Sequence, residues 1–355
     1  MRFEAIKELD LIELSKVFGR VPPSDSPGTS LSSQRWLQFD YKANRVNFHS
    51  KPMNAPELVG FVEATIDGTI KSHQMLPASG RAAIALSGGK DSVSLTIALS
   101  RILSGRGEEL REHAVAITLE GWGDEQVNTY RYAREVADRV GVEHVVLTPA
   151  TVAEVFHLKR PFQEVFREIS QDAHLEQDNK TLVLAQIQRR LVEVAAHERG
   201  IHDLIFGLNL EDLVSEIVLS LSTGHIGLDI PVRPIGRFRY VYPLVYLKKK
   251  VVSLYLETVA PELTKQETVQ RVERGSQSAH FYIAMAAWLS ELWPGIEYQV
   301  VAAYHGMSEV YSSTRTFRDC SNCGATMVIQ STDSSSEPDC YPCRVFRERK
   351  MLTTA

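Results

Sequence analysis

The body of this chain lacks cysteine: none occurs before residue 320, and no apolar run approaches the length of a membrane span. A span needs about 20 consecutive, mostly apolar residues. Secreted proteins held by disulfides distribute their cysteines along the chain, so that class is excluded. Residues 1–16 mix charged with apolar positions and lack the separate basic and apolar regions of a signal peptide. We therefore expect a cytoplasmic protein.

The chain also lacks a strong excess of either charge. Its 355 residues include 39 Lys and Arg against 44 Asp and Glu, a formal net charge of −5. This balance gives no overall attraction to nucleic acid. Basic side chains gather locally at residues 248–250, which favours either contact with RNA or a solvated helix start. The length and an apolar content of 44% fit one large α/β domain with smaller appendages.

From residue 81 onward, short apolar runs alternate with segments of helical periodicity. The runs predict buried strands at 82–86, 114–119, 144–148, 203–207 and 240–243. Strands separated by helices of this length form right-handed crossovers and a parallel sheet covered on both faces, so we predict a doubly wound α/β fold. The predicted division is an N-terminal appendage of unknown role over 1–75, the α/β domain over 76–260, a helical extension over 261–312, and a cysteine-rich ribbon with a basic tail over 313–355.

The segment between the first strand and its helix reads Ser-Gly-Gly-Lys-Asp-Ser, residues 87–92. Gly88 and Gly89 permit backbone conformations closed to other residues and a close approach of phosphate oxygens. The N–H groups at the start of the following helix attract an anion. The simpler alternative is a glycine turn that binds nothing, but it leaves the four polar side chains unexplained.

Those four side chains suit a phosphate site. Lys90 places a point charge on the phosphates, and Asp91 is an oxygen ligand for Mg²⁺. The hydroxyls of Ser87 and Ser92 can donate hydrogen bonds. The segment therefore predicts binding of a nucleoside triphosphate together with Mg²⁺.

The hexapeptide resembles the SGGxDS loop of the ATP pyrophosphatase superfamily. Its members adenylate a carbonyl oxygen, with release of pyrophosphate, and a nitrogen or sulfur nucleophile then displaces AMP. Residues 188–216 resemble the central motif of its tRNA 2-thiolation branch, in which an arginine pair precedes a helix, a strand and a Gly-His-Asn-x-Asp-Asp loop. The resemblance covers roughly residues 80–350 and implies the adenine nucleotide α-hydrolase fold, with ATP bound at the phosphate loop.

Arg189 and Arg190 match the arginine pair, which implies contact with the substrate. Glu120 follows the second strand, where members of the superfamily hold adenine and ribose. The resemblance thus implies a nucleotide bound between the phosphate loop and this second loop.

Gly207, Asn209 and Asp212 match three positions of the loop motif, and the match implies that Asp212 serves Mg²⁺ beside Asp91. Leu208 and Glu211 stand where the branch has His and Asp, although Glu211 keeps a carboxylate. The alternative is a plain strand-to-helix turn in which Asn209 caps the helix.

The cysteines that hold an iron–sulfur cluster in the thiolation branch are missing. The corresponding positions are Leu182, Ala185 and, later in the chain, about His280. Cluster ligands and a persulfide nucleophile both require thiolates. We therefore expect no such cluster, and we expect the sulfur or nitrogen nucleophile to come from outside the chain.

The four cysteines form two C-x₂-C pairs, Cys320 with Cys323 and Cys340 with Cys343, separated by sixteen residues. Four thiolates suit a closed tetrahedral Zn²⁺ site, which predicts structural zinc. Two redox pairs, an absent metal and an iron–sulfur centre on the same thiolates remain as alternatives. The tail resembles the zinc ribbon of 2-thiouridine enzymes.

Taken together, these features predict an ATP-dependent adenylating enzyme that acts on a tRNA base or related nucleobase, with Lys90, Asp91 and Asp212 as catalytic residues. Sulfur would come from a separate donor, such as a thiocarboxylated carrier protein. The alternatives are attack by ammonia or an amine, as in an amide or lysidine-like ligase, and a non-catalytic nucleotide- or RNA-binding subunit. A homodimer remains open.

Overall fold

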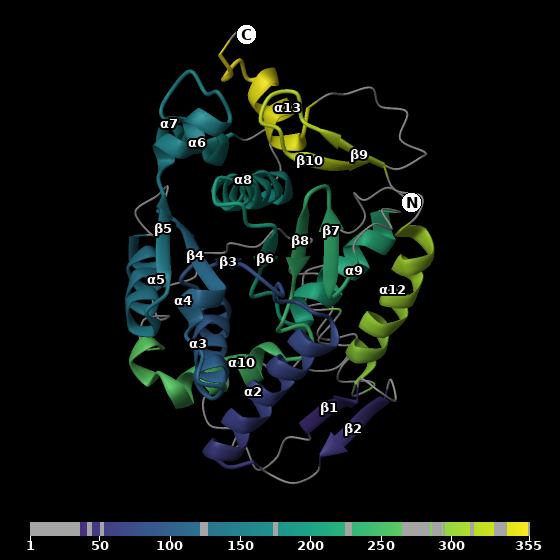
Figure 1. Cartoon of the computed structure of the whole chain (residues 1–355). Coiled ribbons are helices and arrows are strands. Elements are labelled where there is room, and N and C mark those ends of the chain that lie inside the picture. Colours follow the sequence, from purple (N-terminus) through teal and green to yellow (C-terminus); the bar gives the residue numbers. More distant parts are fainter. Residues whose placement is uncertain are drawn as a thin grey trace.

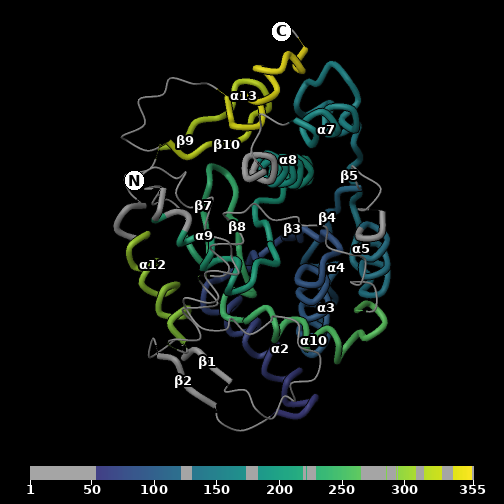
Figure 2. The backbone as a smooth tube through the Cα atoms, turned by 180° about the vertical axis from the view of Figure 1, so that it is seen from behind, coloured from purple at the N-terminus to yellow at the C-terminus, as the bar shows by residue number. Residues whose placement is uncertain are grey.

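The structure is a computed structural model that describes residues 36–40, 45–49, 53–120, 127–172, 177–223, 229–264, 285, 293, 295–312, 316–329 and 339–353. Figure 1 shows a central sheet between layers of helices, with a small hairpin (β9 and β10) and helix α13 (Tyr341–Glu348) above it. The view from behind in Figure 2 shows the same layers.

The central sheet has six strands in the order β5-β4-β3-β6-β8-β7. Their bounds are Ala82–Ala85 for β3, Ala114–Leu119 for β4, Glu143–Leu147 for β5, Asp203–Ile205 for β6, Val232–Ile235 for β7 and Phe238–Val241 for β8. The five strands from β5 to β8 in this order are parallel to one another, and only β7 runs antiparallel, beside β8. This agrees with the predicted doubly wound fold. The apolar pattern does not predict β7, because Arg and Pro interrupt its four residues. Proline is tolerated there because β7 is an antiparallel edge strand.

Alternate residues of β3 face opposite cores. Ala82 and Ile84 pack in one core and Ala83 in the other, as the two-residue period of a strand requires. The first core lies beneath α2 (Ala55–Ser72), α3 (Lys90–Ser104), α5 (Val127–Val140) and α10 (Lys249–Val259). The second lies beneath α6 (Pro149–Val155), α7 (Phe162–Gln171), α8 (Gln177–His197) and α9 (Leu210–Thr223).

Smaller elements surround these layers. An antiparallel hairpin joins β1 (Trp36–Asp40) to β2 (Arg45–His49), and a second joins β9 (Thr316–Asp319) to β10 (Thr326–Ile329). The others are α4 (Leu110–His113), the 3-10 turn η4 (Pro261–Leu263) and α12 (Ile296–Ser312), which lies within the predicted helical extension. Within the described residues, no helix has both the length and the apolar content of a membrane span.

The strand order reverses between β3 and β6. The chain runs from β3 to β4 and β5 on one side, and then crosses back to β6 on the other side of β3. In open α/β sheets, ligands bind outside the carboxyl ends of the strands at such a reversal. The loops over 86–89 and 206–209 both leave the sheet there, so the two motifs identified in the sequence meet at the switch point.

Candidate nucleotide-binding site

The helix that follows β3 begins without a side-chain cap. Gly89 is the N-cap residue of α3, and among the described residues no side chain caps the N–H groups of its first turn. Gly88 has a φ of 79°, a left-handed conformation that glycine adopts at little cost. An uncapped helix start presents N–H donors and the positive end of the helix dipole, which together attract an anion.

The two serines of the phosphate loop bond within the loop. Ser92 Oγ donates to the carbonyl oxygen of Gly89 at 2.9 Å, and the Gly89 N–H donates to Ser87 Oγ at 3.3 Å. The two hydroxyl oxygens are 3.1 Å apart. Since the hydroxyl hydrogen of Ser92 points to Gly89, Ser87 is the donor between the two hydroxyl groups. Both hydroxyl groups therefore bond within the loop and make it more rigid. Among the described residues, the backbone N–H groups of the first turn of α3 remain as donors without a partner.

Gly207 lets the loop after β6 lie directly against the first turn of α3. A Cβ atom at this position would be 2.9 Å from the backbone nitrogen of Ser92 and 3.0 Å from its Cα. These are helix backbone atoms, which cannot turn aside as a side chain can. The glycine that matches the loop motif is therefore required by the close approach of two segments from distant parts of the sequence.

Asn209 joins the start of α9 to the phosphate loop. Its Oδ1 accepts from the backbone N–H of Asp212 at 3.1 Å, and Asp212 Oδ2 accepts from the Asn209 N–H at 3.3 Å, as in a capping box. Its Nδ2 also donates to Asp91 Oδ2 at 3.2 Å. Asn209 thus caps the start of α9, and the same fully buried side chain also bonds to Asp91.

The carboxyl groups of Asp91 and Asp212 form the charged centre of the site. Burial, and then the charge of Asp212, raise the pKa of Asp91 to about 6, against the opposing effect of Lys90 and Lys249. Burial also raises the pKa of Asp212. Asp91 Oδ1 is buried and has no hydrogen-bond partner among the described residues. Two adjacent carboxylates with an unsatisfied buried oxygen fit a divalent cation such as Mg²⁺, which binds through one or two carboxylates and retains other positions for phosphate and water.

Glu211 has a structural partner at the start of α10. Its Oε2 accepts from the backbone N–H of Lys249 at 2.8 Å, and burial raises the pKa of this carboxyl group. The backbone N–H of Leu210 also donates to the carbonyl oxygen of Leu247 at 3.0 Å. These bonds bring the first turn of α10, and with it Lys249, beside the two aspartates. The sequence shows Lys249 only as one of three consecutive lysines, so its place in the site depends on the fold.

Glu120 lies at the carboxyl end of β4, on the same edge of the sheet as the phosphate loop. Its side chain is exposed, and its backbone N–H donates to the carbonyl oxygen of Leu147 at 2.8 Å. Residues 121–126 follow it and lie outside the described residues. Its predicted contact with the nucleotide stays a prediction.

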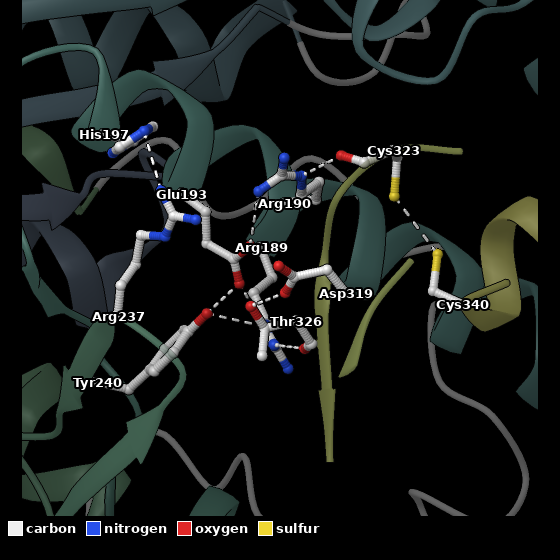
Figure 3. A network of polar contacts seen from close by, with 10 residues as sticks. All are labelled: Arg189, Arg190, Glu193, His197, Arg237, Tyr240, Asp319, Cys323, Thr326 and Cys340. Atoms are coloured by element: carbon white, nitrogen blue, oxygen red, sulfur yellow. Dashed lines mark hydrogen bonds and ion pairs between the residues drawn. The ribbon is translucent and has the colours of Figure 1, made fainter. Parts of the chain in front are cut away.

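The arginine pair lies in a dense polar network beside the cysteine hairpin, which is formed by β9 and β10 and carries Cys320 and Cys323 between its strands (Figure 3). Arg189 donates through Nε to Glu193 and to the Tyr240 hydroxyl, each at 2.9 Å, and through Nη2 to the Thr326 carbonyl oxygen at 3.1 Å. Arg190 donates to Glu193 at 3.2 Å and to the Cys323 carbonyl oxygen at 2.8 Å. Both guanidinium groups therefore tie α8 to the hairpin, and their predicted contact with a substrate stays a prediction.

The four cysteines form one buried cluster. Their sulfur atoms all lie within 4.8 Å of one another, against about 3.8 Å expected between thiolates on a tetrahedral metal with bonds of about 2.3 Å. The backbone N–H of Cys340 donates to Cys320 Sγ at 3.2 Å, and the Asn322 amide donates to Cys343 Sγ at 3.3 Å. Gly324, with a φ of 69°, closes the turn after the first pair. The cluster fits a closed metal site.

The positions without the expected cluster cysteines are only partly described. Ala185 is exposed on α8. The side chain of Leu182, and His280 as a whole, lie outside the described residues. The prediction that the chain carries no iron–sulfur cluster in its body therefore rests on residue identity.

A surface hollow lies away from this chemistry. It has a volume of about 520 Å³ and is lined at the amino ends of the strands by residues that include Arg81, Arg111 and Glu143. Arg81 and Glu143 pair with each other across it. In a doubly wound sheet the ligand site lies at the opposite, carboxyl edge, where the phosphate loop and the two aspartates lie.

A solved structure resembles this chain over most of its length. The U34-tRNA thiolase NcsA from Methanococcus maripaludis, solved with its [4Fe-4S] cluster, matches 86% of this chain and 92% of its own, with a TM-score of 0.63 and 16% sequence identity. The chain has the fold of this thiolase. The resemblance inferred from the phosphate loop and the arginine pair is thus confirmed at the level of the fold.

Two synthetases are less similar to this chain. The NH3-dependent NAD synthetase from Campylobacter jejuni is 14% identical and covers 73% of this chain and 95% of its own, with a TM-score of 0.40. The NMN synthetase from Francisella tularensis is 15% identical over the same shares, with a TM-score of 0.41. No protein-family model matches the sequence, and no curated protein matches it.

Proposed function

We propose that this protein is an ATP-dependent adenylating enzyme. It splits ATP into AMP and pyrophosphate and activates a carbonyl oxygen of a tRNA base or a related nucleobase for sulfur insertion. The observation that carries the proposal is the uncapped start of α3 at the switch point, beside the unsatisfied carboxylate of Asp91. An open set of backbone donors suits phosphate, and an incompletely bonded carboxylate suits a cation that travels with phosphate.

The proposed step is a nucleotidyl transfer. The acceptor carbonyl oxygen attacks the α-phosphorus of ATP and forms a new P–O bond. The bond from this phosphorus to the oxygen that bridges to the β-phosphorus breaks, and pyrophosphate leaves with the electron pair. Asp91 and Asp212 would hold Mg²⁺, which neutralises charge on the phosphates when bound. Lys90 would stabilise the charge that develops on the leaving group.

The nucleophile of the second step comes from another molecule in this proposal. The chain has no cysteine outside the C-terminal cluster, so it has no thiol near the phosphate loop on which to carry sulfur. A carrier protein that ends in a thiocarboxylate could supply the sulfur, which then replaces the adenylated oxygen as AMP leaves. The same lack of a thiol equally favours ammonia or an amine, which would make the enzyme a ligase.

We further propose that the four cysteines bind one structural Zn²⁺ ion. The close sulfur atoms and the N–H donors aimed at two of them support thiolate ligands, and four thiolates leave no open position for catalysis. Metal analysis by mass spectrometry of the purified chain should give about one zinc per chain and no iron. A stoichiometric iron content would contradict this assignment.

The adenylation proposal is tested by measuring AMP and pyrophosphate release with tRNA, a thiocarboxylated carrier and ammonia, separately and combined. Asp91→Asn is the variant expected to lose the reaction, and Asp138→Asn, an exposed aspartate on α5, is the matched control. Labelled sulfur in RNA identifies a thiolase, whereas AMP release that requires ammonia identifies the ligase. Wild-type protein that binds tRNA or nucleotide but releases no pyrophosphate with any acceptor would instead indicate a non-catalytic subunit.

A further inference from the structure

We propose that Lys249 binds the β- and γ-phosphates of ATP and stabilises the pyrophosphate as it leaves. The inference rests on the proposed adenylation and adds to it a residue that the resemblance does not assign. It depends on how the first turn of α10 sits against the start of α9, and on the absence of any competing partner for the Lys249 ammonium group among the described residues.

The start of α10 is held in place by backbone bonds. Glu211, in the first turn of α9, accepts from the Lys249 N–H at 2.8 Å, and the Leu210 N–H donates to the Leu247 carbonyl oxygen at 3.0 Å. On the other side, Ser94 of α3 donates to the Val252 carbonyl oxygen at 3.4 Å. The first turns of α3, α9 and α10 therefore converge, and Lys249 lies where they meet.

The three consecutive lysines have different surroundings. Lys248 forms an ion pair with the buried carboxylate of Glu297 on α12, and Lys250 is exposed at the surface. The ammonium group of Lys249 forms neither an ion pair nor a side-chain hydrogen bond with any described residue. Its charge instead acts on the two aspartates, lowering the pKa of both Asp91 and Asp212 against the effect of their burial.

A bound divalent cation would shift the local charge toward positive. The ammonium groups of Lys90 and Lys249 face the carboxylates of Asp91 and Asp212, and Glu211, which accepts from the backbone of α10, keeps its negative charge. When the two aspartates hold a divalent cation, their charge is offset and the two ammonium groups lose most of their counter-charge. The centre then becomes more positive beside the uncapped start of α3, which suits a polyphosphate.

This arrangement assigns Lys249 to the leaving group. When the bond between the α-phosphorus and the bridging oxygen breaks, the electron pair and the negative charge move to pyrophosphate. An ammonium group without another partner can follow that charge, whereas one held in an ion pair, as in Lys248, cannot. Lys249 should therefore contribute to the binding of ATP and pyrophosphate, and little to the binding of AMP.

The test is calorimetric titration of the full chain with Mg²⁺-ATP, Mg²⁺-pyrophosphate and AMP, in the absence of RNA. Lys249→Met should weaken ATP and pyrophosphate binding by about 10-fold or more, the effect of a lost hydrogen bond to a charged group, and change AMP binding less than about 2-fold. Lys249→Arg should retain part of the affinity. Lys250→Met removes the same charge one residue away and should bind all three ligands like the wild type.

Two results would overturn the assignment while the adenylation proposal stands. One is ATP and pyrophosphate binding that Lys249→Met leaves unchanged. The other is an equal loss for ATP, pyrophosphate and AMP, accompanied by a lower melting temperature than that of Lys250→Met, which would show that Lys249 only supports the fold. Wild-type protein that binds neither ATP nor pyrophosphate would overturn both proposals.

Discussion

The phosphate-loop edge of the sheet and the arginine network beside the cysteine hairpin both bury charged groups, but they satisfy them differently. Glu193, only 1% exposed, accepts hydrogen bonds from Arg189, Arg190 and the Tyr240 hydroxyl. At the phosphate loop, Asp91 Oδ1 has no partner among the described residues, and the charged groups that act on Asp91 include another carboxylate, that of Asp212.

The difference separates a structural network from a binding site. A buried carboxylate that is fully bonded holds its neighbours in one arrangement, because removing any member leaves the others unsatisfied. A buried carboxylate that has one unbonded oxygen and acts against a like charge costs stability until a ligand arrives, since its pKa is raised in the folded state. The following variants test this distinction.

The largest expected effect is on the network. Glu193→Ala leaves two arginines and a tyrosine without their shared acceptor, and loss of one partner from a buried ion pair costs about 3–5 kcal/mol. Urea unfolding measures the loss. Glu198→Ala, whose side chain is 66% exposed in an ion pair with Arg199, should change stability little. Equal effects of the two substitutions would remove the distinction between the network and ordinary surface charge.

Gly207→Ala should have the next largest effect, because its Cβ atom would meet the backbone of α3 at 2.9 Å. Overpacking of this kind costs about 1–3 kcal/mol, and it should also displace the phosphate loop and abolish ATP binding. Gly306→Ala on α12 has nothing within 4 Å of the added atom and should stabilise the chain by about 0.5–1 kcal/mol. Normal ATP affinity in Gly207→Ala would show that the two loops do not share a site.

Asp91→Asn should stabilise the ligand-free protein while abolishing Mg²⁺-dependent activity. Because folding raises the pKa of Asp91 from 3.8 to about 6, this group favours the fold below pH 3.8 and loses that contribution as the pH rises through 6. At pH 8 the neutral amide should gain about 0.5–2 kcal/mol, and at pH 4 the gain should vanish. Melting temperatures across this range measure it, with Asp138→Asn as the exposed control. A gain that does not depend on pH would contradict the electrostatic explanation.

The smallest effect is expected for Ser87→Ala. It removes the acceptor of the Gly89 N–H and the donor to Ser92, bonds worth about 0.5–1.5 kcal/mol each in net terms. ATP should bind a few-fold more weakly because the loop is less rigid. Ser253→Ala, which removes a hydroxyl bonded to the Lys249 carbonyl oxygen within α10, is the control. An ATP affinity like that of the wild type would show that the hydrogen bonds of Ser87 with Gly89 and Ser92 do not order the loop.

Much of the fold follows from local patterns. Continuous apolar runs predict the five parallel strands, because strands buried on both faces contain few polar positions. The antiparallel β7 escapes this rule, since an edge strand tolerates the Arg and Pro that interrupt it. The phosphate loop is equally local: its glycines, lysine and aspartate occupy adjacent positions between a strand and a helix.

The partners of the site residues do not follow from local patterns. Arg189 and Arg190 bond to carbonyl oxygens 137 and 133 residues away, in the cysteine hairpin. Asn209 reaches Asp91 across 118 residues. The sequence identifies these side chains as polar and matches them to motif positions. It does not show whether each side chain contacts a substrate or another part of the fold.

The sequence alone determined the conformations that glycine permits, the place of the phosphate loop between a strand and a helix, the thiolate pairs and the absence of other thiols, because each depends on residue identity and near neighbours. The tertiary structure alone decided which charges are satisfied and which are not. Strand order brings α9 and α10 to the phosphate loop and the hairpin to α8, and a charge acquires its pKa and its partner only from groups that packing places beside it. That is why the arginine pair is bound within the fold, while Asp91 Oδ1 and the Lys249 ammonium group are left without a hydrogen-bond partner among the described residues.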